Sequence, residues 1–158
     1  MAMKSEGVGS GAPISAAGTG HGATRSVMAW QVLSALLLLA MGAIHLYLRF
    51  NGVHGTLGNL FVLNAIGGLV LAIAMVVLRG QLLLLASVLS TLFMAGTLLA
   101  LILALTVGLF GIHENLDYQL VPTTLVVESI GTLVLLATTA LINRTQRGPR
   151  RQAHRVRI

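Results

Sequence analysis

The chain has 158 residues, of which 56% are hydrophobic and only 9% are charged, and its net charge is +6. Soluble domains carry about 25% charged residues, so the composition excludes a soluble domain as the main part of the chain. The length suits one domain. The absence of cysteine excludes disulfides, thiolate metal sites, iron–sulfur clusters and a cysteine nucleophile.

Residues 1–26 are mostly polar and small, rich in Gly, Ala and Ser. Such a segment cannot bury a core, and it is predicted to be a disordered cytoplasmic tail. A secretory signal places its apolar region directly after a short basic start. The long polar lead therefore predicts that the first apolar run is a retained helix.

Four apolar runs follow, at residues 27–48, 57–78, 82–112 and 120–142. Crossing a bilayer takes roughly 20 apolar residues, and each run is long enough. The chain is therefore predicted to be an all-α membrane protein, with an antiparallel bundle of four transmembrane helices over residues 27–142. The third run would measure roughly 46 Å as a straight helix. It is expected to tilt or to project from the outer surface.

Residues 143–158 form an Arg-rich tail that is predicted to be cytoplasmic. Of the ten basic residues, nine fall on the side of the two tails and of the connection near Arg79, and only Arg49 falls on the other side. This bias predicts that both termini face the cytoplasm. The tail suits attraction to anionic lipids of the inner leaflet. Its charge comes with no aromatic or fold signal for specific nucleic-acid binding.

A polar layer is the nearest thing to a functional signature. His45, Asn64, Thr106 and Glu128 each lie at a similar depth, one on each span, in the outer half of the membrane. Ionisable groups inside a membrane are costly and mark function by default, so these residues form the candidate binding site. Asn64 and Thr106 can equally serve as interhelical hydrogen-bond partners. A His45–Glu128 pair can also be purely structural.

The outer rim adds a second group of polar residues: Arg49, His54, His113, Glu114, Asp117 and Tyr118. Histidine and carboxylate side chains are ligand types for zinc or copper. Their spacing matches no metal motif, and solvated loop polarity explains them better.

Two further patterns bear on packing. Spans two and four align when the chain is shifted by about 64 residues, which makes Asn64 and Glu128 equivalent and suggests two tandem helical hairpins of the parallel kind. In span three, small residues recur every fourth position and are predicted to pack against protein along the helix. They are Gly96, Ala100, Ala104 and Gly108.

Three segments carry a family resemblance: residues 42–48, residues 55–64 and residues 108–114. Over about residues 30–142 the chain resembles a group of small four-span hypothetical membrane proteins of high-GC Gram-positive bacteria. The resemblance implies a bacterial plasma membrane and a four-helix bundle, and it implies no particular activity.

Three functions remain open on the sequence. The small size and minimal loops favour a non-enzymatic accessory protein or a small subunit of a membrane assembly, with a membrane-protein partner or a second copy. A redox protein that uses His45 and Glu128 toward a quinone is the alternative, with a haem protein as a weaker variant. A small proton-coupled carrier, acting as an oligomer, is the third.

Overall fold

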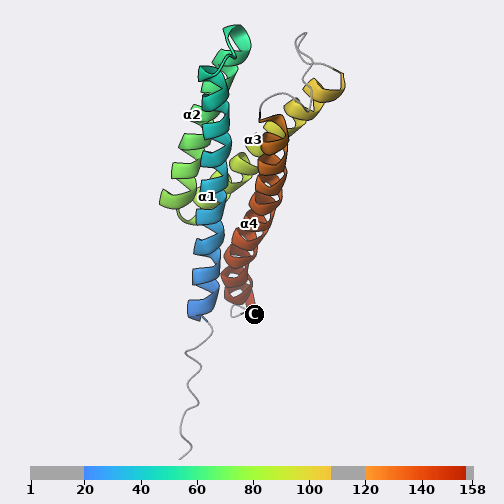
Figure 1. The fold of residues 1–158 in the computed structure, drawn as a ribbon. Helices are drawn as coiled ribbons and strands as arrows, with labels where there is room; N and C mark the ends of the chain where they lie inside the picture. Colours follow the sequence, from blue (N-terminus) through green and yellow to red (C-terminus); the bar gives the residue numbers. More distant parts are fainter. Residues whose placement is uncertain (1–19, 108–119, 156–158) are drawn as a thin grey trace, which may run out of the picture.

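The computed structural model describes residues 20–107 and 120–155, with side chains described over 25–107 and 120–147. This part of the chain forms four α-helices (Figure 1): α1 (Gly20–Phe50), α2 (Gly55–Val77), α3 (Gly80–Thr106) and α4 (Val121–Arg155). Each contains a stretch that is long and apolar enough to cross a membrane. The predicted bundle of four membrane helices is confirmed.

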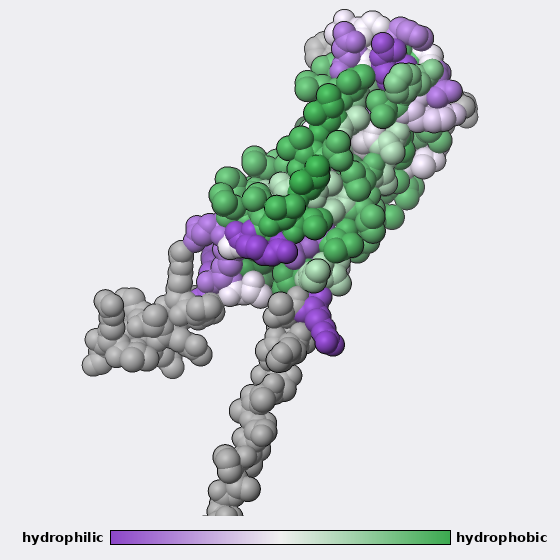
Figure 2. Space-filling view, turned by 90° about the vertical axis from the view of Figure 1, so that its left-hand side faces the viewer, coloured by the Kyte–Doolittle hydropathy of each residue, from purple (hydrophilic) through white to green (hydrophobic). Residues whose placement is uncertain are grey.

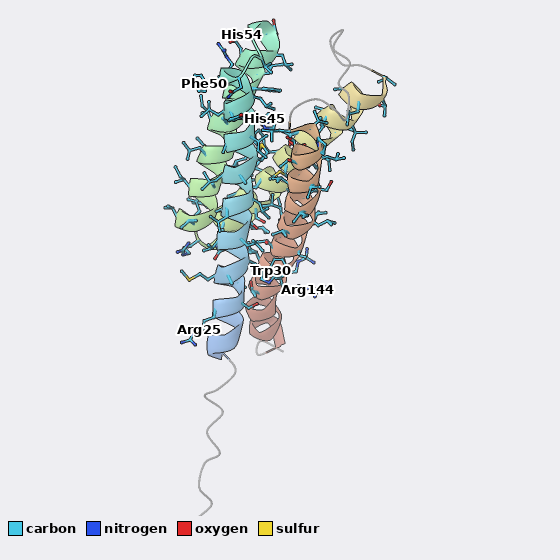
Figure 3. All side chains as sticks on the ribbon, viewed as in Figure 1. Arg25, Trp30, His45, Phe50, His54 and Arg144 are labelled. Atoms are coloured by element: carbon cyan, nitrogen blue, oxygen red, sulfur yellow. The ribbon has the colours of Figure 1, made fainter. Side chains whose placement is uncertain are left out.

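The surface has the layering expected of a protein dissolved in lipid. Figure 2 shows a continuous apolar band between two polar ends. Arg25 and Arg144 lie at one end, and Phe50 and His54 lie at the other (Figure 3). We call these the Arg144 end and the His54 end.

The helices differ from the predicted spans by more than two residues at three boundaries. α1 begins at Gly20, within the segment that was expected to be disordered, and α4 continues to Arg155 through most of the Arg-rich tail. α3 ends at Thr106, where the N–H of the capping residue Val107 donates to the Leu103 carbonyl. An apolar run marks the part of a helix that lies in the hydrocarbon of the membrane. It does not mark the residues at which the helix begins and ends. The rest of the predicted third span, to residue 112, lies outside the described residues.

The turn between α1 and α2 is fixed by a glycine. Gly52 has a φ of 120°, which favours glycine because it has no Cβ. This conformation lets the Val53 N–H donate to the Leu48 carbonyl at 3.2 Å, which satisfies a carbonyl at the end of α1. The resulting tight turn makes α1 and α2 antiparallel neighbours.

The four helices do not pack evenly around the bundle. α1 packs closely on α2 and α4, and α3 packs on α4, whereas α2 and α3 have the least contact of the four neighbouring pairs. In Figure 1, α3 slants away from α2 toward the His54 end. Met41, Met75, Met94 and Leu135 are fully buried between the helices. The bundle is therefore closed on three sides and loose between α2 and α3.

The small residues of α3 do not pack as predicted. A Cβ built on Gly96 would meet nothing within 4 Å, and Ala100 is only partly buried. Ala104 is buried, and Gly108 lies outside the described residues. The expectation of continuous protein contact was wrong, because α3 leans away from α2 and the missing side-chain volume leaves space there.

Close α1–α2 packing depends on glycine, and this predicts a stability effect. A Cβ on Gly68 would lie 3.0 Å from the Leu38 carbonyl oxygen, which is backbone and cannot move aside. Gly68→Val should force α1 and α2 apart and lower stability by about 1–3 kcal/mol. Thermal unfolding in detergent measures this. Gly96→Ala is the control and should leave the melting temperature unchanged or raise it, since its Cβ meets open space. Equal melting temperatures for the two variants would contradict the close packing of α1 and α2 at Gly68.

Candidate functional site

His45 lies on the side of α1 that faces α4 (Figure 3). Its ring nitrogen Nδ1 is 2.9 Å from the Met41 carbonyl oxygen. A carbonyl can only accept, so Nδ1 carries the proton and Nε2 points the other way. The ring of Phe61 on α2 packs edge-on against the imidazole, with centroids 4.9 Å apart. His45 is thus held in one orientation from two sides.

Glu128 on α4 is 0% exposed, and neither of its carboxyl oxygens has a hydrogen-bond partner within 3.5 Å among the described residues. The Thr97 hydroxyl on α3 lies beside the carboxyl group, but it donates its proton to the Met94 carbonyl at 2.8 Å. The nearest charged or titratable group is His45, whose Nε2 is 3.9 Å from Oε1. This is too long for a hydrogen bond, which needs roughly 3 Å between the heavy atoms. Buried polar groups are nearly always satisfied, so this carboxyl group needs an explanation.

A cavity of about 520 Å³ lies beside this pair, at the His54 end of the bundle. All four helices contribute to its lining, which is mostly apolar, with Phe61 and Phe93 among its walls. Its polar lining residues are His45, Asn64, Thr97, Thr124 and Glu128. Ligand sites in proteins have this character: a largely apolar space of about 300–1,000 Å³ with a few placed polar groups.

The small residues of α3 leave room for this cavity. Gly96, Ala100 and Ala104 all line it. Its lining also includes Leu63 of α2 and Leu92 of α3, which are 64% and 65% exposed. These two residues lie on the loosely packed side of the bundle. The cavity therefore opens sideways, between α2 and α3, toward the lipid.

Three of the four residues of the predicted polar layer line this cavity: His45, Asn64 and Glu128. Thr106 is not brought to it. Its side chain is exposed, and its hydroxyl donates to the Ile102 carbonyl at 2.8 Å. Two residues of helix turn the side chain by about 200°, so Thr106 and the cavity-lining Ala104 lie on opposite faces of α3. The predicted depth was also wrong for this residue: Gly131 packs on Met94, so Glu128 is level with Thr97, and Thr106 lies nine residues, or about 13 Å, farther along α3.

Of the predicted outer rim, the two described residues, Arg49 and His54, do not line the cavity. Arg49 lies against α2, where a Cβ on Gly58 would be 2.8 Å from its Cδ. His54 is exposed and has its Nδ1 2.9 Å from the Gly52 carbonyl oxygen. His113, Glu114, Asp117 and Tyr118 lie outside the described residues. Within the described part of the chain, no three His, Asp or Glu side chains gather as a metal site.

Sequence reasoning missed three residues that shape the cavity: Phe61, Phe93 and Thr97. Phe93 packs on Gly67, where a Cβ would lie 2.8 Å from its ring. Aromatic and hydroxyl residues are common on membrane helices, so nothing in their type marked them. Their positions could have identified Phe93 and Thr97, because the two residues lie one turn apart on α3 and on either side of Gly96.

A second polar cluster lies toward the Arg144 end, and its hydroxyl groups bond one another across the helices. Ser34 of α1 and Thr138 of α4 share a hydrogen bond of 2.9 Å. Thr139 bonds Ser87 and, at 3.1 Å, Thr91, both on α3. Such bonds hold membrane helices together by about 0.6 kcal/mol each. This cluster joins α1, α3 and α4 and has the character of a structural contact.

No protein-family profile, no curated protein and no solved structure matches this chain. The site must be interpreted from its own chemistry.

A haem does not fit the residues at this site. Axial ligation would use His45 Nε2, since Nδ1 is engaged by Met41. That nitrogen faces the Glu128 carboxyl group at 3.9 Å, which occupies the position where the iron and porphyrin would lie. The described lining of the cavity offers no second histidine.

The unpartnered carboxyl group predicts that Glu128 does not stabilise the fold. Glu128→Leu should leave the melting temperature in detergent unchanged or raise it, because an unsatisfied buried polar group costs about 1–3 kcal/mol. Thr138→Val is the control and should lower stability by about 0.6 kcal/mol, since it removes a satisfied hydroxyl. A larger loss in Glu128→Leu than in the control would make the His45–Glu128 pair structural.

Proposed function

We propose that this integral membrane protein binds a membrane-dissolved amphipathic molecule, and that it acts as a non-enzymatic accessory protein or small subunit that holds this molecule. The observation that carries the proposal is a fully buried carboxyl group at the wall of an apolar cavity, without a hydrogen-bond partner among the described residues. A bound polar head would satisfy Glu128, and an apolar body would fill the remaining space. The sideways opening between α2 and α3 suits a molecule that arrives through the lipid.

The interior toward the Arg144 end argues against a carrier. Glu128 and Thr138 are ten residues apart on α4, or about 15 Å along the helix. Between their levels lie the fully buried side chains of Leu38, Met41, Met94 and Leu135. A proton-coupled carrier needs its site to reach both faces of the membrane. This apolar layer supports a site that serves one side only.

The orientation is a part of the proposal. We propose a bacterial plasma membrane, on the resemblance, with both termini cytoplasmic, on the charge bias. Arg25, Arg79 and Arg144 would then meet the anionic inner leaflet, and the cavity would lie in the outer half of the membrane.

Cysteine labelling tests this orientation. Asn51 and Gln81 are exposed in or beside the two short turns, and the chain has no cysteine of its own. In intact cells, a membrane-impermeant thiol reagent should label Asn51→Cys and not Gln81→Cys. Both should react after permeabilisation. The reverse pattern in intact cells would invert the topology.

Filling the cavity should remove the bound molecule. Ala100→Phe places a ring in the cavity, and Leu99→Phe places the same ring on the neighbouring, 57% exposed position, which does not line it. Each protein would be extracted in polymer-bounded membrane discs and its lipids identified by mass spectrometry. One amphiphile should be enriched with wild type and Leu99→Phe, and depleted at least about tenfold with Ala100→Phe, since the site no longer has room for it.

Gly96→Leu provides a second filling variant if Ala100→Phe fails to fold, because a Cβ there meets nothing within 4 Å. Identical extracts from the wild type and a folded filling variant would contradict the proposed function.

A further inference from the structure

We infer that the head of the bound molecule is a neutral, hydroxyl-bearing aromatic ring of the hydroquinone class, which donates its O–H to Glu128 while its tail leaves the bundle between α2 and α3. This inference rests on the proposed function and names the class of ligand for the same site. It concerns binding of the reduced, hydroxyl-bearing form.

The head must be a hydrogen-bond donor. Both oxygens of Glu128 lack hydrogen-bond partners within the part of the chain that the structure describes. An ionised carboxyl group only accepts, and a protonated one still keeps an oxygen that only accepts. His45 Nε2 also accepts when the ring is neutral, because Nδ1 is committed to the Met41 carbonyl. In each arrangement Glu128 offers an acceptor that the described protein residues leave unused, and an O–H group satisfies it.

The head is better neutral than charged. Its route through the α2–α3 opening passes hydrocarbon, where an isolated ammonium group is costly and a hydroxyl group much less so. A phosphate head is disfavoured more strongly, because it would place a second negative charge and no donor beside the carboxyl group. Phospholipids therefore do not match the buried end of this cavity.

The walls favour a ring over a linear alcohol. Phe61 and Phe93 line the cavity from facing helices, α2 and α3. Aromatic rings pair in edge-to-face or offset arrangements that contribute about 0.5–1.5 kcal/mol beyond area burial. Phe61 already holds the His45 ring in such an arrangement, at 90° between planes. A ring beside it would lie within reach of both phenylalanines and of Glu128.

The opening between α2 and α3 gives the tail a path into the lipid. Leu38, Met41, Met94 and Leu135 close the bundle toward the Arg144 end. Exposed Leu63 and Leu92 flank the opening to the lipid. A prenyl or alkyl chain would pass between them and remain in hydrocarbon along its whole length.

Three synthetic probes test this inference on the full-length protein in lipid nanodiscs under anaerobic conditions. They are decylhydroquinone, its dimethyl ether, and dodecylamine. The ether keeps ring and tail but has no O–H. Equilibrium ligand depletion should give a dissociation constant for the hydroquinone at least about tenfold lower than for the ether or the amine, because only the hydroquinone O–H can donate to the buried acceptor and remain neutral.

Variants of Glu128 assign the preference to this residue. Glu128→Leu should bind the hydroquinone and its ether equally, and Glu128→Gln, which keeps a weaker acceptor, should retain an intermediate preference. Binding of both probes should be lost in Ala100→Phe and kept in Leu99→Phe.

The outcomes separate the two proposals. Equal binding of hydroquinone and ether to wild type, with both lost in Ala100→Phe, would overturn the hydroxyl head and leave the binding function standing. Tighter binding of dodecylamine than of decylhydroquinone would overturn the neutral head and indicate that the site binds a cationic one. Absence of binding by all three would overturn the ligand class, whereas the lipid extracts decide the binding function independently.

Discussion

Hydrocarbon offers no hydrogen-bond partners, so every polar group of this chain within the membrane depends on a partner inside the protein. The backbone meets this demand by forming helices. Most threonine hydroxyls meet it locally, by donating to the carbonyl one turn earlier, as Thr124, Thr132 and Thr138 do at 2.8 Å. Others meet it between helices, as Ser34 does with Thr138. Against this background three buried oxygens without a partner among the described residues stand out: Ser90 Oγ and the two carboxyl oxygens of Glu128. Of these two residues, only Glu128 lines the cavity.

Glycine serves two opposite purposes in the packing. Gly42 and Gly68 bring α1 and α2 together, since a Cβ on either would lie 3.3 Å or 3.0 Å from a backbone oxygen of the other helix. Gly96 does the reverse, because its missing side chain leaves open space beside α2. In lipid, close approach supplies the attraction that the hydrophobic effect supplies in water. The well-packed α1–α2 pair can therefore hold the bundle while α3 leans away and leaves a cavity.

The fold followed from the sequence because length and apolarity decide which segments cross a membrane. The depth of His45, Asn64 and Glu128 was also predictable, since residues rise along a helix at a constant rate. The direction in which each side chain points was harder to predict. Thr106 lies nine residues beyond Thr97, which is level with Glu128, and its side chain faces away from the cavity; the register and tilt of α3 that decide this are not visible in the sequence. The space beside Gly96 was not predictable either, because a row of small residues is compatible with a tight seam and with a cavity wall. The tilt of α3 decides between them, and tilt depends on all four helices.

The distance between His45 and Glu128 distinguishes two roles for these residues: a structural pair and a ligand-binding site. A structural pair would gain by moving about 1 Å closer and forming a hydrogen bond, and side chains of this length can move that far. Instead Nδ1 and Phe61 fix the imidazole, and the carboxyl group stays 3.9 Å away beside the cavity. Leaving it unsatisfied costs about 1–3 kcal/mol. A ligand that donates to Glu128 would recover this free energy on binding, and the same free energy would then distinguish a hydroxyl-bearing head from the many lipids that only fill apolar space.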